Sequence, residues 1–237
     1  MSPFTRLAIP LALMTTLVAL AVAAAERRET RAASGFTAIS LAAPVKVDVT
    51  QGDVEGLVVE GDEAALADLE TVVEQGTLKI RARSRKDVAG MSKARVHVSA
   101  KAIDALRISG SGDIDAPKLR TATLKIAVSG SGDVRIAELD ATTLDVSVAG
   151  SGDVMVGGKA DTLSTSIAGS GDVKAGKLAV RTAKVSIAGS GDVMLWAREQ
   201  LSVSVVGSGD VRFYGDPEVK RSIMGSGSVR RLGATPS

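Results

Sequence analysis

In the second half of the chain, aliphatic side chains alternate with small or polar ones. In one such stretch, Leu124, Ile126 and Val128 alternate with Lys125 and Ala127. A period of two residues is typical of a β-strand that buries one face and exposes the other. The aliphatic positions are mainly Val, Ile and Leu, which suit a strand of this kind. The pattern therefore predicts a series of half-buried strands.

A four-residue motif, Gly-Ser-Gly-Asp, interrupts the alternation at intervals of 20, 20, 19, 20, 18 and 18 residues, and its seventh copy ends in Ser228 in place of Asp. Both glycines share the parity of the aliphatic residues, so they point inward in an extended chain. Glycine there removes bulk and tolerates a positive φ. We therefore predict that the motif glycines form tight structural corners. They are Gly110, Gly112, Gly130, Gly132, Gly150, Gly152, Gly169, Gly171, Gly189, Gly191, Gly207, Gly209, Gly225 and Gly227.

A unit of this length cannot bury its own apolar face, so successive units are expected to stack. If each strand pairs with its equivalent in the next coil, about 4.8 Å away, the inward side chains form one continuous core. A β-propeller is the competing repeat fold, but its blades take about 40 residues, twice the period seen here. We predict an all-β, single-chain parallel β-helix with coils of about 18–20 residues. Right-handed coiling is favoured by the general handedness of parallel crossovers.

The regular repeat array is expected to span residues 106–232, followed by a short tail at 233–237. Residues 36–105 also contain alternating segments, such as Val45–Val49, but they lack the motif. We interpret this region as irregular β coils that cap one end of the array. A short helix is expected after Asp62, whose side chain suits the N-cap position.

The last coil is expected to cap the other end. Arg221 and Arg231 occupy positions that are apolar in the earlier copies of the repeat. A terminal coil has no neighbour to cover it, so a polar end is expected there.

Residues 1–25 have the form of a secretory signal peptide. Arg6 supplies a positive charge, and the run Leu7–Ala25 is almost entirely apolar and ends in alanines. The run is also about long enough for an uncleaved membrane anchor, but its Ala-rich end favours cleavage. Residues 26–35 are expected to form a disordered leader. The chain is thus predicted to be exported to the periplasm, the cell surface or the extracellular space, without a transmembrane segment in its mature form.

Composition narrows the classes of function. The formal net charge is +2 and basic residues are not clustered, which disfavours a nucleic-acid-binding surface. Cysteine is absent and His97 is the sole histidine, so a zinc site is not expected. Aromatic residues make up 2% of the chain, which leaves few of the aromatic platforms that sugar-binding grooves usually need.

The repeated aspartates are the one candidate binding feature. Stacking would place them in an outward-facing column with neighbours about 5 Å apart. Such a column could bind Ca²⁺, which prefers six to eight oxygen ligands, or its side chains could fix tight turns through local hydrogen bonds. We favour the turn role, because each coil supplies one carboxylate, and we keep weak Ca²⁺ binding as an alternative. No other cofactor or metal is expected. The column comprises Asp113, Asp133, Asp153, Asp172, Asp192 and Asp210.

Several segments resemble a known family. They are Phe36–Ile39, Val45–Val49, Val58–Asp62, Gly76–Ile80 and the Gly-Ser-Gly-Asp array itself. Together they make residues 36–232 similar to the family called "putative auto-transporter adhesin, head GIN domain". The resemblance implies an exported bacterial β-helix protein, and it supplies no catalytic residues.

We therefore expect a non-catalytic exported module for adhesion or cell-envelope interaction, with envelope proteins or glycans as partners. The alternative is a carbohydrate-active β-helix enzyme of the polysaccharide lyase or hydrolase type. Such an enzyme would need a unique cluster of acids and bases in a groove. Here the acids recur once per coil, so no catalytic residue is assigned.

Overall fold

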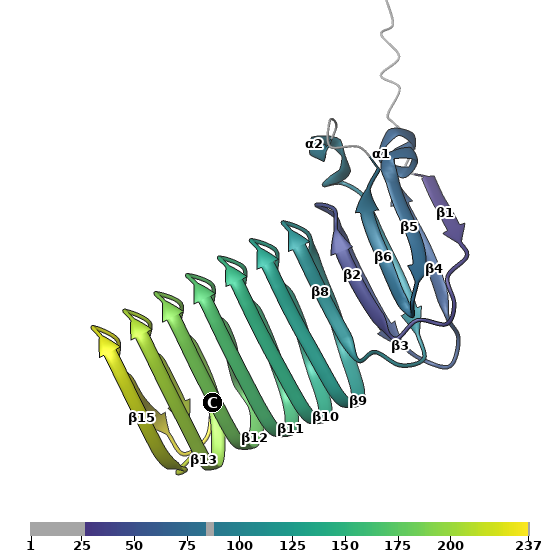
Figure 1. Cartoon of the computed structure of the whole chain (residues 1–237). Coiled ribbons are helices and arrows are strands. Elements are labelled where there is room, and N and C mark those ends of the chain that lie inside the picture. Colours follow the sequence, from purple (N-terminus) through teal and green to yellow (C-terminus); the bar gives the residue numbers. More distant parts are fainter. Residues whose placement is uncertain (1–26, 84–87, 237) are drawn as a thin grey trace, which may run out of the picture.

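Stacked β coils make up almost the whole of the chain that the structure describes (Figure 1). A computed structural model describes residues 27–83 and 88–236. Within them the strands join into one 16-stranded sheet, which winds into a β-solenoid of about six turns. The predicted all-β parallel β-helix is thereby confirmed. The predicted signal peptide, residues 1–25, lies outside the described residues.

The elements fall into an N-terminal group and a regular array. The N-terminal group contains β1 (Arg27–Arg31), β2 (Ala38–Ala42), β3 (Lys46–Gln51), β4 (Gly56–Gly61), α1 (Glu63–Asp68), β5 (Leu69–Glu74), β6 (Thr77–Ala82), α2 (Val88–Met91) and β7 (Arg95–Ala100). The array contains β8 (Ala105–Gly110), β9 (Asp113–Gly130), β10 (Val134–Gly150), β11 (Val154–Gly169), β12 (Val173–Gly189), β13 (Val193–Gly207), β14 (Val211–Tyr214), β15 (Glu218–Gly225) and β16 (Val229–Gly233).

Each long strand of the array runs around the solenoid from one motif corner to the next. The first residues of β9, Asp113–Asp115, pair with β3, whereas its last residues, Lys125–Gly130, pair with β8 on the other face. Equivalent residues of successive coils are neighbours in parallel register, as Val128, Val148 and Ile167 show. This register brings the inward aliphatic residues into continuous rows.

Those rows form the core, which runs the length of the solenoid. Ile126, Val146 and Val185 belong to one row and are buried. Thr165 occupies the same row in β11, is 2% exposed, and its hydroxyl has no hydrogen-bond partner within the described structure. These rows are therefore mainly aliphatic, as the alternation predicts, and Thr165 is the one buried polar residue among the residues that the structure describes.

The N-terminal coils do not stack in the order of the sequence. β2 and β3 pair directly with β8 and β9, whereas the later strands β6 and β7 pair with β2 and β3 from the outer side. After β1, which lies at the outer edge of the sheet on β4, the chain enters beside the array with β2 and β3, runs outward, and returns between β7 and β8. Gln75 and Gly76 have φ values of 49° and 71° and form a two-residue turn, which makes β5 pair antiparallel with β6.

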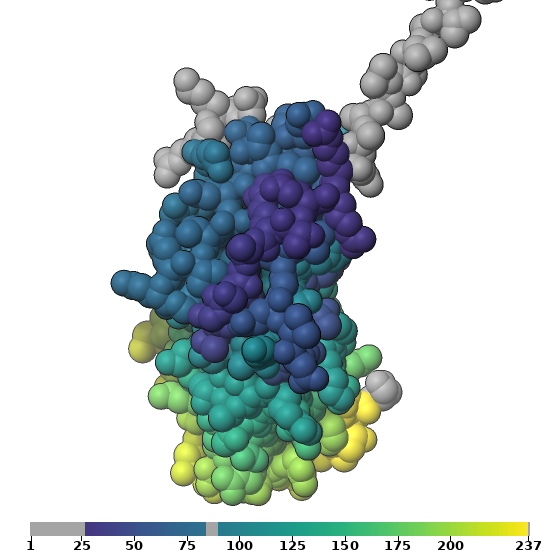
Figure 2. Space-filling model, turned by 90° about the vertical axis from the view of Figure 1, so that its right-hand side faces the viewer, coloured from purple at the N-terminus to yellow at the C-terminus, as the bar shows by residue number. Residues whose placement is uncertain are grey.

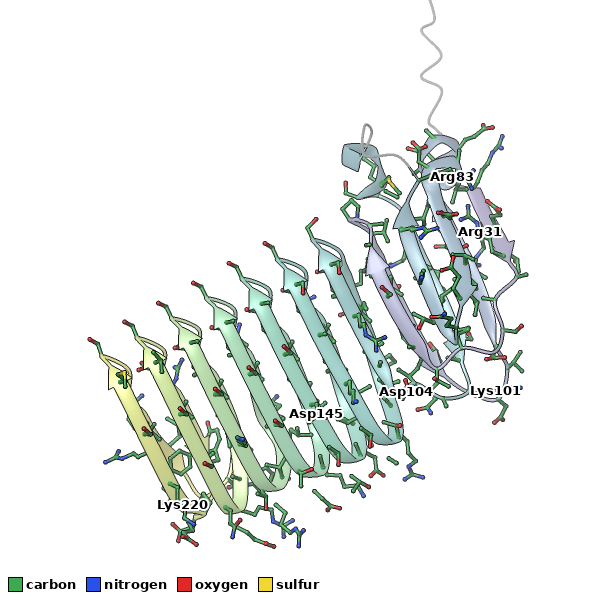
Figure 3. The ribbon with its side chains drawn as sticks, viewed as in Figure 1. Arg31, Arg83, Lys101, Asp104, Asp145 and Lys220 are labelled. Carbon is green, nitrogen blue, oxygen red and sulfur yellow. The ribbon has the colours of Figure 1, made fainter. Side chains whose placement is uncertain are left out.

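The prediction that residues 26–35 form a disordered leader is wrong for residues 27–31. These residues form β1, which pairs antiparallel with β4. Arg31 fixes this strand, because its guanidinium donates hydrogen bonds to the carbonyls of Leu66 (2.7 Å) and Leu69 (2.5 Å) (Figure 3). These carbonyls lie at the C-terminal end of α1, where a cation is favourable. The helix itself begins as predicted, since Asp62 Oδ1 accepts a hydrogen bond from the Ala65 N–H at 2.7 Å.

The two ends of the solenoid differ. Figure 2 looks onto the N-terminal end, where residues of the N-terminal group cover the coils behind them. The opposite end is formed by β15 and β16, and most of their residues are exposed (Figure 1). Neither helix in the described part of the chain has the length and apolar character needed to cross a membrane.

Candidate functional site

The two glycines of each motif serve different structural needs. Gly150, the first of its pair, has a φ of 133°, a conformation that glycine alone adopts readily. Gly152, the second, is buried, and a Cβ there would lie 2.2 Å from the carbonyl oxygen of Gly132 and 2.8 Å from a Val128 methyl group. The inward direction predicted for both glycines thus holds for the second, whereas the first needs glycine for its backbone angle and for the close approach of the neighbouring coil.

The six motif aspartates lie one coil apart and are joined by hydrogen bonds along the solenoid. In each step, Oδ1 of one aspartate accepts a hydrogen bond from the backbone N–H of the next motif position. The distances along the series are 3.0, 3.0, 3.1, 3.0 and 2.9 Å, and Asp210 bonds Ser228 at 2.9 Å. The carboxylates therefore bridge coils, a role beyond the local turn that the motif predicts.

The second oxygen of several aspartates bonds a basic side chain two residues after a motif. Asp133 Oδ2 bonds Arg135 at 2.6 Å, and Asp192 Oδ2 bonds Arg212 at 2.7 Å. Lys174 Nζ lies 2.6 Å from Asp153 Oδ2, and this hydrogen bond raises the pKa of the Lys174 ammonium. These cations offset the repulsion expected between stacked carboxylates.

The aspartate column carries no clear metal site. No cluster of three or more metal-ligating side chains occurs in residues 27–83 and 88–236. Four of its members already place Oδ2 within 3.7 Å of a cation. Weak Ca²⁺ binding by the column stays a prediction.

A groove lies beside this column on the outer face of the array. It has a volume of about 770 Å³ and spans β10 to β14. Its apolar lining includes Ala137, Met155, Gly157, Gly176, Met194, Tyr214 and Pro236, and its basic lining consists of Arg135, Lys174, Lys177 and Arg212. We call this feature the outer groove.

Missing side chains create the outer groove. Ala137, Gly157 and Gly176 occupy the same position of three successive repeats, where later repeats carry Trp196 and Tyr214. A Cβ on Gly176 would lie 3.0 Å from the Met194 sulfur and 3.7 Å from the Tyr214 ring. Met194 and Tyr214 therefore pack against Gly176, which is buried beneath them.

The sequence analysis missed this groove, although the repeat contains its signal. From Asp133 onward, the residue two positions after each motif aspartate alternates between basic and methionine: Arg135, Met155, Lys174, Met194 and Arg212. Such methionines are adaptable apolar contacts at binding surfaces. Aligning the repeats at this position predicts a column of mixed chemistry. The depression beside it becomes evident only from the stacking.

The sole histidine of the chain lies in the N-terminal coils, away from the outer groove. His97 is on β7, between Asp48 (3.5 Å) and Glu60 (3.2 Å), in the N-terminal coils. Both carboxylates also bond arginines, Asp48 with Arg95 and Glu60 with Arg28. This cluster ties β1, β3, β4 and β7 together and is not part of the outer groove.

Solved structures of bacterial proteins share this fold. A putative adhesin from Bacteroides fragilis is 24% identical, with a TM-score of 0.84 over 88% of this chain and 97% of that one. A putative lipid binding protein from Parabacteroides distasonis is 28% identical, with a TM-score of 0.72 over 87% and 96% of the two chains. A putative adhesin from Parabacteroides merdae is 20% identical, with a TM-score of 0.70 over 87% and 96%.

No protein with a curated description matches the chain. A family model matches residues 35–217, which include the N-terminal coils and the array up to β14. This span contains the whole outer groove except Pro236. The chain therefore belongs to the family described as "putative auto-transporter adhesin, head GIN domain".

Proposed function

We propose that this chain is a non-catalytic exported module that attaches to the cell envelope by binding an amphiphilic envelope component in the outer groove. The observation that carries the proposal is the groove itself, an apolar depression across five successive strands of a rigid stack. Small-molecule sites are concave and mainly apolar, with a few polar groups that fix orientation. The outer groove has these properties.

The charges beside the groove favour an anionic head group. Arg135, Lys174 and Arg212 are each paired with aspartates, so they are held in place along one side. Lys177 also lines the groove and has no ion-pair partner in the part of the chain that the structure describes. A lipid with its acyl chain over Gly157 and Gly176 and an anionic head group at Lys177 would match both the apolar lining and the basic side of the groove.

The family description and the names of similar solved structures support this proposal. Relatives are named putative adhesins, which agrees with an exported or surface location. The relative that is 28% identical is named a putative lipid binding protein, which agrees with an apolar groove. A lipid as the bound component accounts for both names.

The chemistry of the groove favours binding over catalysis. Its two carboxylates, Asp172 and Asp192, each bond the next coil through Oδ1 and face a cation through Oδ2. A general acid or base must be able to exchange a proton with substrate. Carboxylates held in this way serve as structural groups.

Vesicle binding tests the proposal. The mature chain should co-sediment with vesicles of phosphatidylethanolamine and phosphatidylglycerol, and with bacterial envelope extract. Glycan arrays provide the alternative arm, because envelope glycans are the other candidate partner. Binding to glycans without binding to vesicles would refute the lipid proposal.

A further inference from the structure

The last coil leaves two strand edges unpaired. β15 pairs with β13 on one side and β16 pairs with β14 on one side, and neither has a partner beyond it among the described residues. Figure 1 shows β15 at the end of the stack opposite α1. About half of the backbone N–H and C=O groups of such a strand face outward, and they form a template for another strand.

The apolar rows of the core are open at this end. Val219 and Ile223 are 37% and 36% exposed, whereas their neighbours one coil inward, Leu201 and Val205, are each 1% exposed. Repeat proteins usually cover such a face with a polar cap. Here the polar cap is incomplete, because Val219 and Ile223 stay partly exposed on either side of a basic residue of β15.

That cation is Arg221, in the inward row that contains Val203 one coil earlier. Arg221 has no ion-pair partner within the described structure, whereas Arg231, also at an inward position, donates a hydrogen bond to the Gly215 carbonyl at 2.6 Å. A purely apolar strand laid on β15 would bury the Arg221 charge unpaired, which is costly. A second copy would bring a further set of arginines to the same end. A carboxylate opposite Arg221 removes the cost.

The chain itself turns away from β15. After β16 it reaches Pro236, which lies in the outer groove with Tyr214. Residues 234–236 therefore lead toward the outer face, and the β15 edge stays free of them. The labelled Lys220 side chain marks this end in Figure 3.

We propose that the β15 edge is a docking site for an extended acidic segment of a partner protein, which adds a strand to the stack. Backbone hydrogen bonds along the edge provide affinity, and side chains at alternate positions provide specificity. The segment places apolar residues against Val219 and Ile223 and a carboxylate against Arg221. This site is distinct from the outer groove and does not depend on the function proposed for it.

A designed peptide tests the docking site. The probe is a seven-residue peptide that matches Glu218–Met224 of β15, with valines opposite Val219 and Ile223 and a central glutamate opposite Arg221. The pattern reads the same in both directions, so it fits parallel or antiparallel addition. A second peptide carries lysine in place of the glutamate. Fluorescence anisotropy gives the affinities, and amide hydrogen exchange of residues 218–225 reports strand addition.

The charge of residue 221 should decide whether the chain binds the glutamate peptide or the lysine peptide more tightly. The wild-type chain should bind the glutamate peptide about tenfold or more tighter than the lysine peptide, and Arg221→Glu should reverse this order. Arg230→Glu, the same charge change on β16, should leave the order unchanged. Arg221 is exposed, so both variants should keep the wild-type circular dichroism spectrum. The proposal is wrong if neither peptide protects the β15 amides, if Arg221→Glu keeps the wild-type preference, or if the edge is protected by dimerisation of the chain.

Discussion

Asp133 Oδ1 accepts a hydrogen bond from the backbone N–H of Asp153, one coil further along the solenoid, at 3.0 Å. The same bond recurs between successive motif aspartates, so each carboxylate satisfies a backbone donor of the next coil. A buried or half-buried N–H without a partner is costly. The acidic residue of the motif therefore has a structural reason to recur, independent of any ligand.

Replacing Asp133 should separate the hydrogen bond from the charge. Asp133→Asn keeps an oxygen acceptor for the Asp153 N–H and loses the ion pair with Arg135, so it should cost less than about 1 kcal/mol. Asp133→Ala removes the acceptor and should cost about 1.5–3 kcal/mol. Urea unfolding of both variants measures the difference. Equal losses would show that charge, and not the bridge between coils, explains the column.

The tight contact between coils predicts different costs for alanine at two motif glycines. Gly110 and Gly150 both have a positive φ, so alanine strains the backbone at either position. A Cβ on Gly110 meets no atom within 4 Å, whereas a Cβ on Gly150 would lie 2.3 Å from the Gly130 carbonyl oxygen. Gly150→Ala should therefore cost about 1–3 kcal/mol more than Gly110→Ala, the usual range for overpacking. Similar urea midpoints for the two variants would contradict this packing.

Thr165 is the polar exception in an aliphatic row. Its buried hydroxyl has no hydrogen-bond partner in the described structure, and neighbouring coils carry Val146 and Val185 there. Thr165→Val should raise the free energy of unfolding by about 1–3 kcal/mol, because it removes an unsatisfied buried group and keeps the shape. Thr142→Val, at an exposed position of β10, is the control and should change little. A loss of stability in Thr165→Val would indicate a partner for the hydroxyl.

The pairing of Lys174 with Asp153 predicts a dependence on alkaline pH. The hydrogen bond that Lys174 donates to Asp153 raises the pKa of the Lys174 ammonium, so the contribution of this pair to stability is complete below the unfolded-state lysine pKa of about 10.4. It is lost as the pH rises through the higher folded-state pKa. The side chain is partly exposed, so the contribution should stay below about 1 kcal/mol. The stability difference between the wild type and Lys174→Met should shrink above this pH, and a constant difference would argue against the pair.

The regular half of the fold could be predicted because every level of the sequence agrees there. Residues such as Ile126 and Val128 alternate with polar ones, and the motif glycines mark each corner, so period and stacking follow directly. The order of the N-terminal coils could not be predicted, because the alternation of apolar and polar residues makes β2 and β6 equally plausible neighbours for the array. Their places depend on tertiary pairing. β1 was missed because its sequence, Arg-Arg-Glu-Thr-Arg, is polar and gains its order from the β4 edge and from Arg31.

The candidate site was less predictable than the fold. The aspartates were found because they repeat, but their bonds to the next coil depend on the register. The outer groove was missed because it is defined by absent side chains at Gly157 and Gly176, which a search for reactive residues does not find. Its neighbours Met155 and Met194 are exposed or half-exposed apolar residues, which become notable only once they are seen in one column.

A pair of glycine variants tests the outer groove most directly. Gly176→Leu should fill the groove between Met194 and Tyr214, and the flexible Met194 side chain can move to admit it. Gly52→Leu adds the same side chain in the loop between β3 and β4, where a Cβ meets no atom within 4 Å. Titration with a fluorescent palmitate analogue should show saturable binding to the wild type and to Gly52→Leu, and binding to Gly176→Leu weakened about tenfold or more. Absence of saturable binding to the wild type, or equal affinities of the two variants, would contradict the proposal that the outer groove holds an envelope lipid.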